Sequence, residues 1–209
     1  MEQSYFFNDV NGDREYGMED FALYFRKFLS SGVYHQDNQP ELRVTTGAGL
    51  TTILETGSAF IEGYMYQNTE DITQTHNAAD MTNPRIDRVV LRLDRNVNAR
   101  EIKAVIKNGI PATNPVPPTL QRDDFIYEVS LAQVLINAGS TTINSITDER
   151  YDSSVCGFVS SLITIPTDDF KRQFDEWFLG IQNQIGARLL YSIEEPIEPI
   201  AGDIWLKTV

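Results

Sequence analysis

The sequence contains one cysteine, Cys156, and two histidines, His35 and His76, among its 209 residues. A single cysteine excludes a disulfide within the chain. Its apolar neighbours, in VCGFV, indicate a small core residue rather than a nucleophile, which would need one of the two histidines as its base. Zinc sites need histidines and cysteines at short spacings. Because these three residues lie far apart in the sequence, we expect no metal site.

Basic residues are scarce as well. The chain has seventeen lysines and arginines and thirty acidic residues, which gives a net charge of −13. Nucleic-acid binders neutralise phosphates with positive charge, so we expect no nucleic-acid partner, and adsorption to anionic membranes is equally disfavoured. No apolar run approaches the ~18 residues that span a membrane. The start, MEQSYFFNDVNGDRE, lacks the layout of a signal peptide, so we expect synthesis and folding in the cytoplasm.

Motifs for catalysis or cofactor binding are missing too. The stretch DVNGDREYGMED begins like a calcium loop, but Arg14 replaces the required glycine and Asp20 the bidentate glutamate. It is better interpreted as a turn before a helix. TTGAGLTT lacks the lysine and the spacing of a phosphate-binding loop, and no serine stands in a G-x-S-x-G elbow.

Paired carboxylates for glycoside hydrolysis can come from distant positions. In a chain with thirty acids, the presence of several carboxylates is no evidence for a hydrolase. We therefore expect no catalytic residue and no cofactor. The candidates are Glu55, Glu62, Asp123, Asp124 and Glu128.

Folded structure is well supported, since 41% of the residues are hydrophobic and 11% aromatic. Residues 18–30 have apolar side chains around more than half of a helical circumference, which predicts a helix buried against its domain. From about residue 42 to 165 the period changes to two, and turn-forming clusters such as NVNA and NAGSTT separate the short runs. This pattern is typical of an antiparallel β-sandwich or barrel-like domain.

The only basic island, residues 85–107, contains the stretch NPRIDRVVLRLDRN. Arginines at 85, 88, 92 and 95 fit one face of a helix, but the β-branched residues between them favour a strand. Alternation places Val89, Leu91 and Leu93 inward, with Arg88 and Arg92 outward, and EIKAVIK would complete a hairpin. The two arginines either form a solvated face paired with acids or dock electrostatically on an acidic partner, including another copy of this chain.

Residues 166–188 change period again. Thr167 is a plausible N-cap, and Phe174, Phe178, Ile181 and Ile185 follow the a/d spacing of a short coiled coil, which Phe170 and Trp177 widen. The helix could pack on its own domain. We favour self-association through these six residues. Residues 189–209 then indicate a short proline-rich linker and a small β-element, after a β-rich domain with an N-terminal helix over residues 1–165.

Several stretches in order resemble a family of tail and baseplate proteins from bacteriophages of Gram-positive hosts and related phage-tail-like particles. They are PRIDRVVLRLD, VIKNGIPATNPVPPTL and YEVSLAQVLINAGSTTINSITDERYD, followed by CGFV. The matching positions include Arg85, Asp87, Arg92, Lys107 and Gly109. The resemblance spans roughly residues 5–165. EEPIEPIAGDIWLK separately resembles a short element of phage fibre and baseplate proteins.

The resemblance implies a non-enzymatic structural component of a virion tail baseplate or fibre base, often a homotrimer, with its β-domain docked on other tail proteins. The helix of residues 166–188 would then be the trimerisation helix, and the chain an adaptor linking the tail to host-recognition parts. The alternative is that this chain is itself the receptor protein, which binds host cell-wall glycans through exposed aromatics such as Tyr64, Tyr66 and Trp205.

Overall fold

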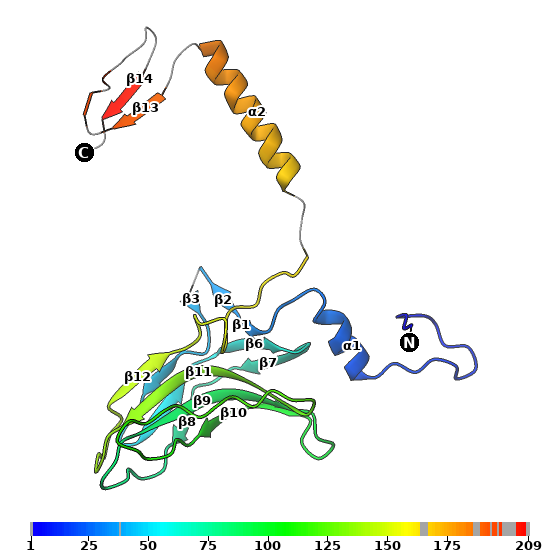
Figure 1. The fold of residues 1–209 in the computed structure, drawn as a ribbon. Helices are drawn as coiled ribbons and strands as arrows, with labels where there is room; N and C mark the ends of the chain where they lie inside the picture. Colours follow the sequence, from blue (N-terminus) through cyan, green and yellow to red (C-terminus); the bar gives the residue numbers. More distant parts are fainter. Residues whose placement is uncertain are drawn as a thin grey trace. The chain divides into compact units, whose positions relative to one another are not determined.

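The computed structural model describes residues 2–37, 39–163, 167–185, 189–192, 194–195, 197 and 204–207. The chain divides into two units, Met1–Ile163 and Thr164–Val209. The structure is mainly β, as predicted, and the described residues include two helices, α1 (Met18–Phe25) and α2 (Asp168–Ile185). Figure 1 shows the sheets of the first unit with α1 at one side.

Antiparallel sheets make up most of the first unit. The largest has the strand order β10–β9–β11–β12, formed by β9 (Arg85–Asp94), β10 (Glu101–Lys107), β11 (Ile126–Ile136) and β12 (Ser145–Asp148). A second has the order β4–β5–β8, formed by β4 (Val44–Thr46), β5 (Thr51–Leu54) and β8 (Ile72–Thr75). A third has the order β1–β6–β7, formed by β1 (Gly32–Val33), β6 (Gly57–Ile61) and β7 (Tyr64–Asn68). A short pair consists of β2 (His35–Gln36) and β3 (Gln39–Pro40).

The arginine-rich stretch is strand β9, and with β10 it forms the predicted hairpin. Val89 pairs with Ile106 and Leu91 with Ala104. Directly opposed residues of paired strands project to the same face. Val89, Leu91 and Leu93 of β9 therefore lie on one apolar face, whereas Val90 lies on the opposite face with Arg88 and Arg92.

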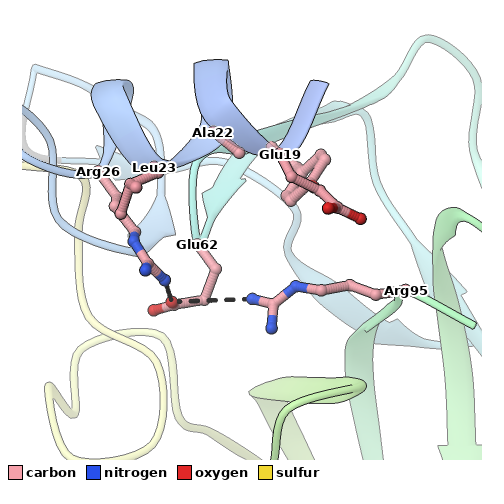
Figure 2. A pocket seen from close by; sticks show the side chains of 7 residues that line it. Glu19, Ala22, Leu23, Arg26, Glu62 and Arg95 are labelled. Carbon is pink, nitrogen blue, oxygen red and sulfur yellow. Dashed lines mark hydrogen bonds and ion pairs between the residues drawn. The ribbon is translucent and has the colours of Figure 1, made fainter. Parts of the chain in front are cut away.

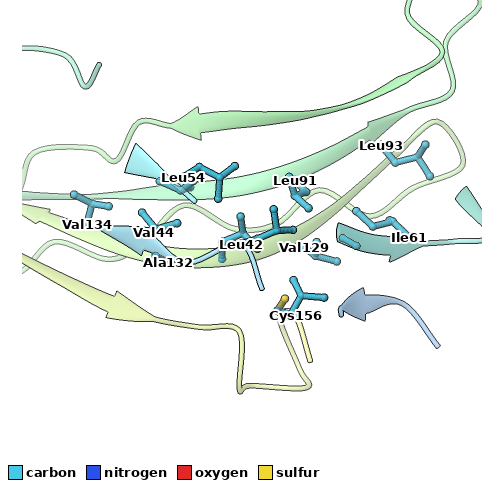
Figure 3. Close-up of a cluster of buried hydrophobic side chains, with 14 of the residues drawn as sticks. Leu42, Val44, Leu54, Ile61, Leu91, Leu93, Val129, Ala132, Val134 and Cys156 are labelled. Atoms are coloured by element: carbon cyan, nitrogen blue, oxygen red, sulfur yellow. The ribbon is translucent and has the colours of Figure 1, made fainter. Parts of the chain in front are cut away.

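The core combines the apolar face with residues of the other two sheets (Figure 3). Its fully buried members include Leu42, Leu54, Ile61, Leu91 and Val134. Cys156 also lies in this cluster, with 6% of its surface exposed, so its predicted role as a small core residue is confirmed. Burial raises the pKa of its thiol to about 12, which leaves it protonated and unreactive near neutral pH.

Helix α1 is shorter and more exposed than predicted. It ends at Phe25 rather than near residue 30, and of its residues only Ala22 is buried. Phe21, Tyr24 and Phe25 are all more than a third exposed, so the prediction of a buried helix is wrong. The contact with the domain is made by backbone: a Cβ added at Gly63 would lie 2.1 Å from the Ala22 carbonyl oxygen. Such close approach needs a glycine and leaves the large side chains outside.

The second unit contains α2, preceded by Thr167, whose carbonyl oxygen accepts a hydrogen bond from the Lys171 N–H at 2.8 Å. Strands β13 (Leu189–Ser192) and β14 (Ile204–Lys207) form a parallel pair.

Candidate functional site

One face of α2 carries large apolar side chains that are exposed, and we call this face the α2 stripe. Its described members are Phe170, Phe174, Trp177, Phe178 and Ile181. The exposed fractions run from 69% at Phe170 to 47% at Phe178, and Ile181 is half-buried. Phe174 stacks on Phe178 with ring centroids 6.0 Å apart, so the rings form a continuous apolar surface. The helix carries Ile185, but its side chain lies outside the described residues.

The rest of α2 is charged and stabilised within the helix. Lys171 pairs with Asp175 at 3.0 Å, and Arg172 pairs with both Asp169 and Glu176. Such i,i+3 and i,i+4 pairs contribute a few tenths of a kcal/mol each, about 0.2–0.5. Apart from Leu179, which is exposed outside the stripe, the helix thus has one apolar face and a polar remainder, which is the pattern of a helix that buries one side in a partner.

The arginines of β9 have a different environment from the one predicted. Arg88 is 7% exposed, so the expectation that it lies on a solvated face is wrong, whereas the expected pairing with an acid is found. Its guanidinium donates twice to the Glu149 carboxylate, at 2.9 Å each, and once to the Pro118 carbonyl oxygen at 2.7 Å. The reason is that this face of the sheet is covered by segments far away in the sequence, around Pro118 and Glu149.

Arg92 belongs to a second cluster on the same face. Glu128, with a fully buried side chain, accepts from Arg92 at 2.8 Å and from Lys107 at 2.5 Å. Burial raises the pKa of Glu128, but hydrogen bonds from the Gln121 N–H, Lys107 and Arg92 outweigh it, so the pKa is lowered. The Arg92 side chain is 35% exposed, and its docking on a partner stays a prediction. Glu128 is an ion-pair partner held away from solvent rather than an available acid.

A third buried cluster has the connectivity of a hydrolase triad. Thr52 Oγ1 lies 3.2 Å from His76 Nε2, and His76 Nδ1 lies 2.8 Å from Asp87 Oδ2. Asp87 also accepts from Arg85 Nε at 3.0 Å and from the Gly109 N–H at 2.8 Å. Burial raises its pKa, and the bonds from His76, Arg85 and Gly109 more than reverse that, so the pKa is lowered.

Catalysis by this cluster is excluded by its burial. The exposed fraction is 0% for Thr52 and Asp87 and 3% for His76, so a substrate cannot reach the hydroxyl. The three residues come from β5, from the segment just after β8, and from β9. The cluster therefore joins two sheets, and its role is to hold them together.

These buried clusters contain several residues of the motifs quoted from the sequence. Asp87, Lys107 and Gly109, separated in the chain, meet in the buried clusters, and so do Arg85 and Arg92. Buried charges need such partners, because an unpaired one costs several kcal/mol, about 3–5. The ordered motifs of residues 85–150 thus specify the interior of the domain. They do not assemble an open site.

An open groove does exist beside α1. Two adjoining cavities of about 180 and 710 Å³ share Glu19, Tyr64 and Arg95 in their linings. In the smaller one, Glu62 pairs with Arg26 at 2.9 Å and lies 3.8 Å from Arg95 (Figure 2). From the sequence, Glu62 was predicted only as a candidate catalytic acid. The structure places it as a link between α1, the β6–β7 turn and the loop after β9.

The larger cavity, which we call the α1 groove, is lined by both apolar and charged residues, and the charged ones include Glu19, Asp94 and Glu101. Met18, Met65 and Val97 are 72%, 62% and 78% exposed. Leu93 and Ile102 line it more deeply, and Arg100 stands at its rim. Sequence reasoning missed the groove because its walls come from four separate segments. Gly63, whose φ is 90°, is a local signal of the turn between β6 and β7 that precedes Tyr64 and Met65 of the groove.

The aromatics considered for glycan binding are less available than expected. Tyr64 and Tyr66 are half-buried and pack against the core. Burial also raises the pKa of both phenols. Trp205 is half-buried in β14.

The stretch of residues 9–13 is a turn before α1, as predicted. The Asp9 carboxylate accepts from the backbone N–H groups of Gly12 and Arg14, at 3.1 Å each. Across the described residues, no group of three or more histidines, cysteines or acids is arranged to hold a metal ion.

Comparison with protein-family models, with curated proteins and with solved structures finds no match to this chain. Of the helices in the described part of the chain, none is both long enough and apolar enough to span a membrane.

Proposed function

We propose that this chain is a non-enzymatic structural component of a phage tail baseplate or tail-fibre base, an adaptor that forms a homotrimer through α2. The α2 stripe carries the proposal. Four large aromatic side chains between Phe170 and Phe178 are each about half exposed or more. Exposed apolar surface of this kind, on an otherwise charged helix, is typical of an interaction face.

The energetics favour burial of the stripe against other copies. Fully burying one large apolar side chain contributes about 1.5–3 kcal/mol. Several such residues from each of three helices would offset the entropy of association. The stripe is also broader than an a/d seam, because Phe170 and Trp177 flank it on one side. A broad apolar face suits contact with two neighbouring helices, as in a trimer.

The first unit would be the docking domain, with a sandwich-like arrangement of its sheets. Two features support that arrangement. The Gln74 amide donates to the Ala104 carbonyl oxygen at 3.0 Å and joins the outer strands β8 and β10. Arg150 donates to the carbonyl oxygens of Pro40 and Glu41, which ties the segment after β12 to the segment before β4. A rigid domain with buried polar clusters suits a role in positioning other proteins.

A pair of matched variants tests the self-association. Phe178→Asp places a charge in the stripe and should convert the oligomer to a monomer in light scattering. Leu179→Asp makes the same change at the next residue, which is 56% exposed but lies outside the stripe, and should leave the oligomer intact. An unchanged mass for Phe178→Asp, with the circular dichroism of the β-domain retained, would overturn the interface.

A further inference from the structure

The dipeptide Asn–Gly occurs twice in the chain, at Asn11–Gly12 before α1 and at Asn108–Gly109 directly after β10. Such a pair is prone to a spontaneous reaction, because glycine has no side chain to hinder attack of its backbone nitrogen on the neighbouring side-chain amide. The reacting groups are the same at the two positions. A large difference in their reactivity must therefore come from the fold.

The reaction is deamidation through a cyclic imide. The glycine nitrogen loses its proton and forms a bond to Cγ of the asparagine, while the bond between Cγ and Nδ2 breaks and ammonia leaves. Water then opens the imide at either carbonyl and gives aspartate or isoaspartate. Water is the only co-reactant. The reaction requires a glycine N–H that is free to lose its proton and a backbone that can rotate about φ and ψ, its two soft dihedrals.

The fold holds Asn108–Gly109 in an unreactive state. The Gly109 N–H donates to the Asp87 carboxylate, which is fully buried, at 2.8 Å. Reaction at this nitrogen would remove one donor from a charged group in the interior, where a lost hydrogen bond is costly. The backbone is also fixed by close packing, since a Cβ added at Gly109 would lie 2.1 Å from the Ile86 carbonyl oxygen.

The residues on both sides of this pair are anchored as well. Lys107 pairs with Arg88 in the β9–β10 ladder. The Ala112 N–H donates to the Pro84 carbonyl oxygen at 3.0 Å. Backbone rotation at Asn108 would therefore disturb contacts with β9 and with the residue that precedes it.

Asn11–Gly12 is open by comparison. Both residues are exposed, with φ values of 60° and 81°, and a Cβ added at Gly12 meets nothing within 4 Å. The Gly12 N–H also donates to a carboxylate, that of Asp9, at 3.1 Å. Asp9 is exposed, however, so water can replace this bond at little cost.

The turn around Asn11 is held by bonds among its own residues. The Asp9 carboxylate accepts from the Arg14 N–H at 3.1 Å, and the Asp13 carboxylate accepts from the Val10 N–H at 2.7 Å. All of these residues are exposed. An exposed turn with few buried contacts opens locally at a low free-energy cost, and this opening gives the backbone the freedom that the reaction needs.

From these observations we propose that Asn11 is a site of spontaneous deamidation, and that the fold protects the same dipeptide at Asn108. The product carries an added negative charge beside Asp9 and Asp13, and its isoaspartate form also has an additional backbone carbon in the turn. The modification therefore changes the segment before α1 and leaves the core intact. This inference does not depend on assembly through α2.

The test is peptide mapping by mass spectrometry of the full-length chain after incubation at mildly alkaline pH, with the aspartate and isoaspartate products separated by chromatography. In the folded chain, conversion of Asn11 should be at least about tenfold faster than conversion of Asn108, a difference of ~1.4 kcal/mol in activation free energy. The chain unfolded in urea is the matched control, and there the two rates should converge.

Two further measurements identify the cause. In hydrogen exchange of the folded chain, the Gly109 amide should exchange more slowly than the Gly12 amide. Gly12→Ala places a side chain beside the attacking nitrogen and should abolish detectable conversion of Asn11 over the same period. Gly139→Ala is the control, because Gly139 also has a left-handed φ and open space around an added Cβ, and it should leave the rate at Asn11 unchanged.

Three outcomes would overturn the proposal. The first is an Asn11 that stays intact in the folded chain while it converts in urea. The second is equal conversion of Asn11 and Asn108 in the folded chain. The third is a rate difference that persists in urea, because it would then arise from the flanking residues and not from the fold.

Discussion

Arg88 and Glu149 face each other as a two-pronged ion pair, with Nε–Oε2 and Nη2–Oε1 distances of 2.9 Å. Their side chains are 9% and 8% exposed. Glu149 also accepts from the Ser130 hydroxyl and from the Gln133 amide. The pair thus ties β9 and β11 to the segment after β12 on the face of the sheet opposite the aliphatic core.

Removal of one partner should be costly. Arg88→Ala leaves the Glu149 carboxylate buried and uncompensated, so the free energy of unfolding should fall by about 3–5 kcal/mol in urea denaturation. Lys103→Ala is the control, because Lys103 pairs with Glu101 at 2.7 Å but is 66% exposed. An exposed pair contributes under ~1 kcal/mol. Similar losses for the two variants would contradict the structural role given to the Arg88–Glu149 pair.

The buried carboxylates should make the protein sensitive to acid. The pKa values of Asp87, Glu128 and Glu149 are lowered below their ordinary values of 3.8, 4.5 and 4.5. Below those values the unfolded chain binds protons that the folded chain does not, so unfolding becomes easier as the pH falls. The contribution of these three groups to the free energy of unfolding should be constant above about pH 5 and should decline below it.

Glu128→Gln tests this dependence, since it removes one of the three titrating groups. The variant should be less stable at neutral pH and lose less stability between pH 5 and 3, measured by denaturation at each pH. A pH profile parallel to that of the unaltered chain would show that Glu128 does not carry the effect.

Gly63 should be far less replaceable than a glycine in open space. Gly63→Ala forces a Cβ into the Ala22 carbonyl oxygen and should loosen α1, seen as faster amide exchange of residues 18–25. Gly139 has a similar left-handed φ of 65°, with nothing within 4 Å of an added Cβ. Gly139→Ala should therefore cost only the conformational term, about 1–2 kcal/mol. Equal effects would mean that α1 does not rest on the turn.

Gly180 tests the limits of the α2 stripe. A Cβ at this position meets nothing within 4 Å, and the residue lies outside the stripe. Gly180→Ala should raise helix stability by about 0.8–1.0 kcal/mol and increase the melting temperature without changing the mass. Loss of the oligomer in this variant would place another helix against Gly180.

Local patterns predicted part of this molecule and missed the rest for physical reasons. Alternation identified β9 and β10, because hydrophobic period is a local property of a strand. It could not show that the outer face of Arg88 is covered, since Pro118 and Glu149 come from distant segments. The burial of α1 was overestimated from composition, whereas the actual contact is a backbone approach at Gly63.

The most direct test of the central claim is the solution mass, by light scattering, of the full chain beside a truncation ending at Ile163. We expect a trimeric full chain and a truncation whose mass falls well below that of the trimer. A monomeric full chain would contradict self-association through α2, and a truncation that stays trimeric would place the assembly contacts in the first unit.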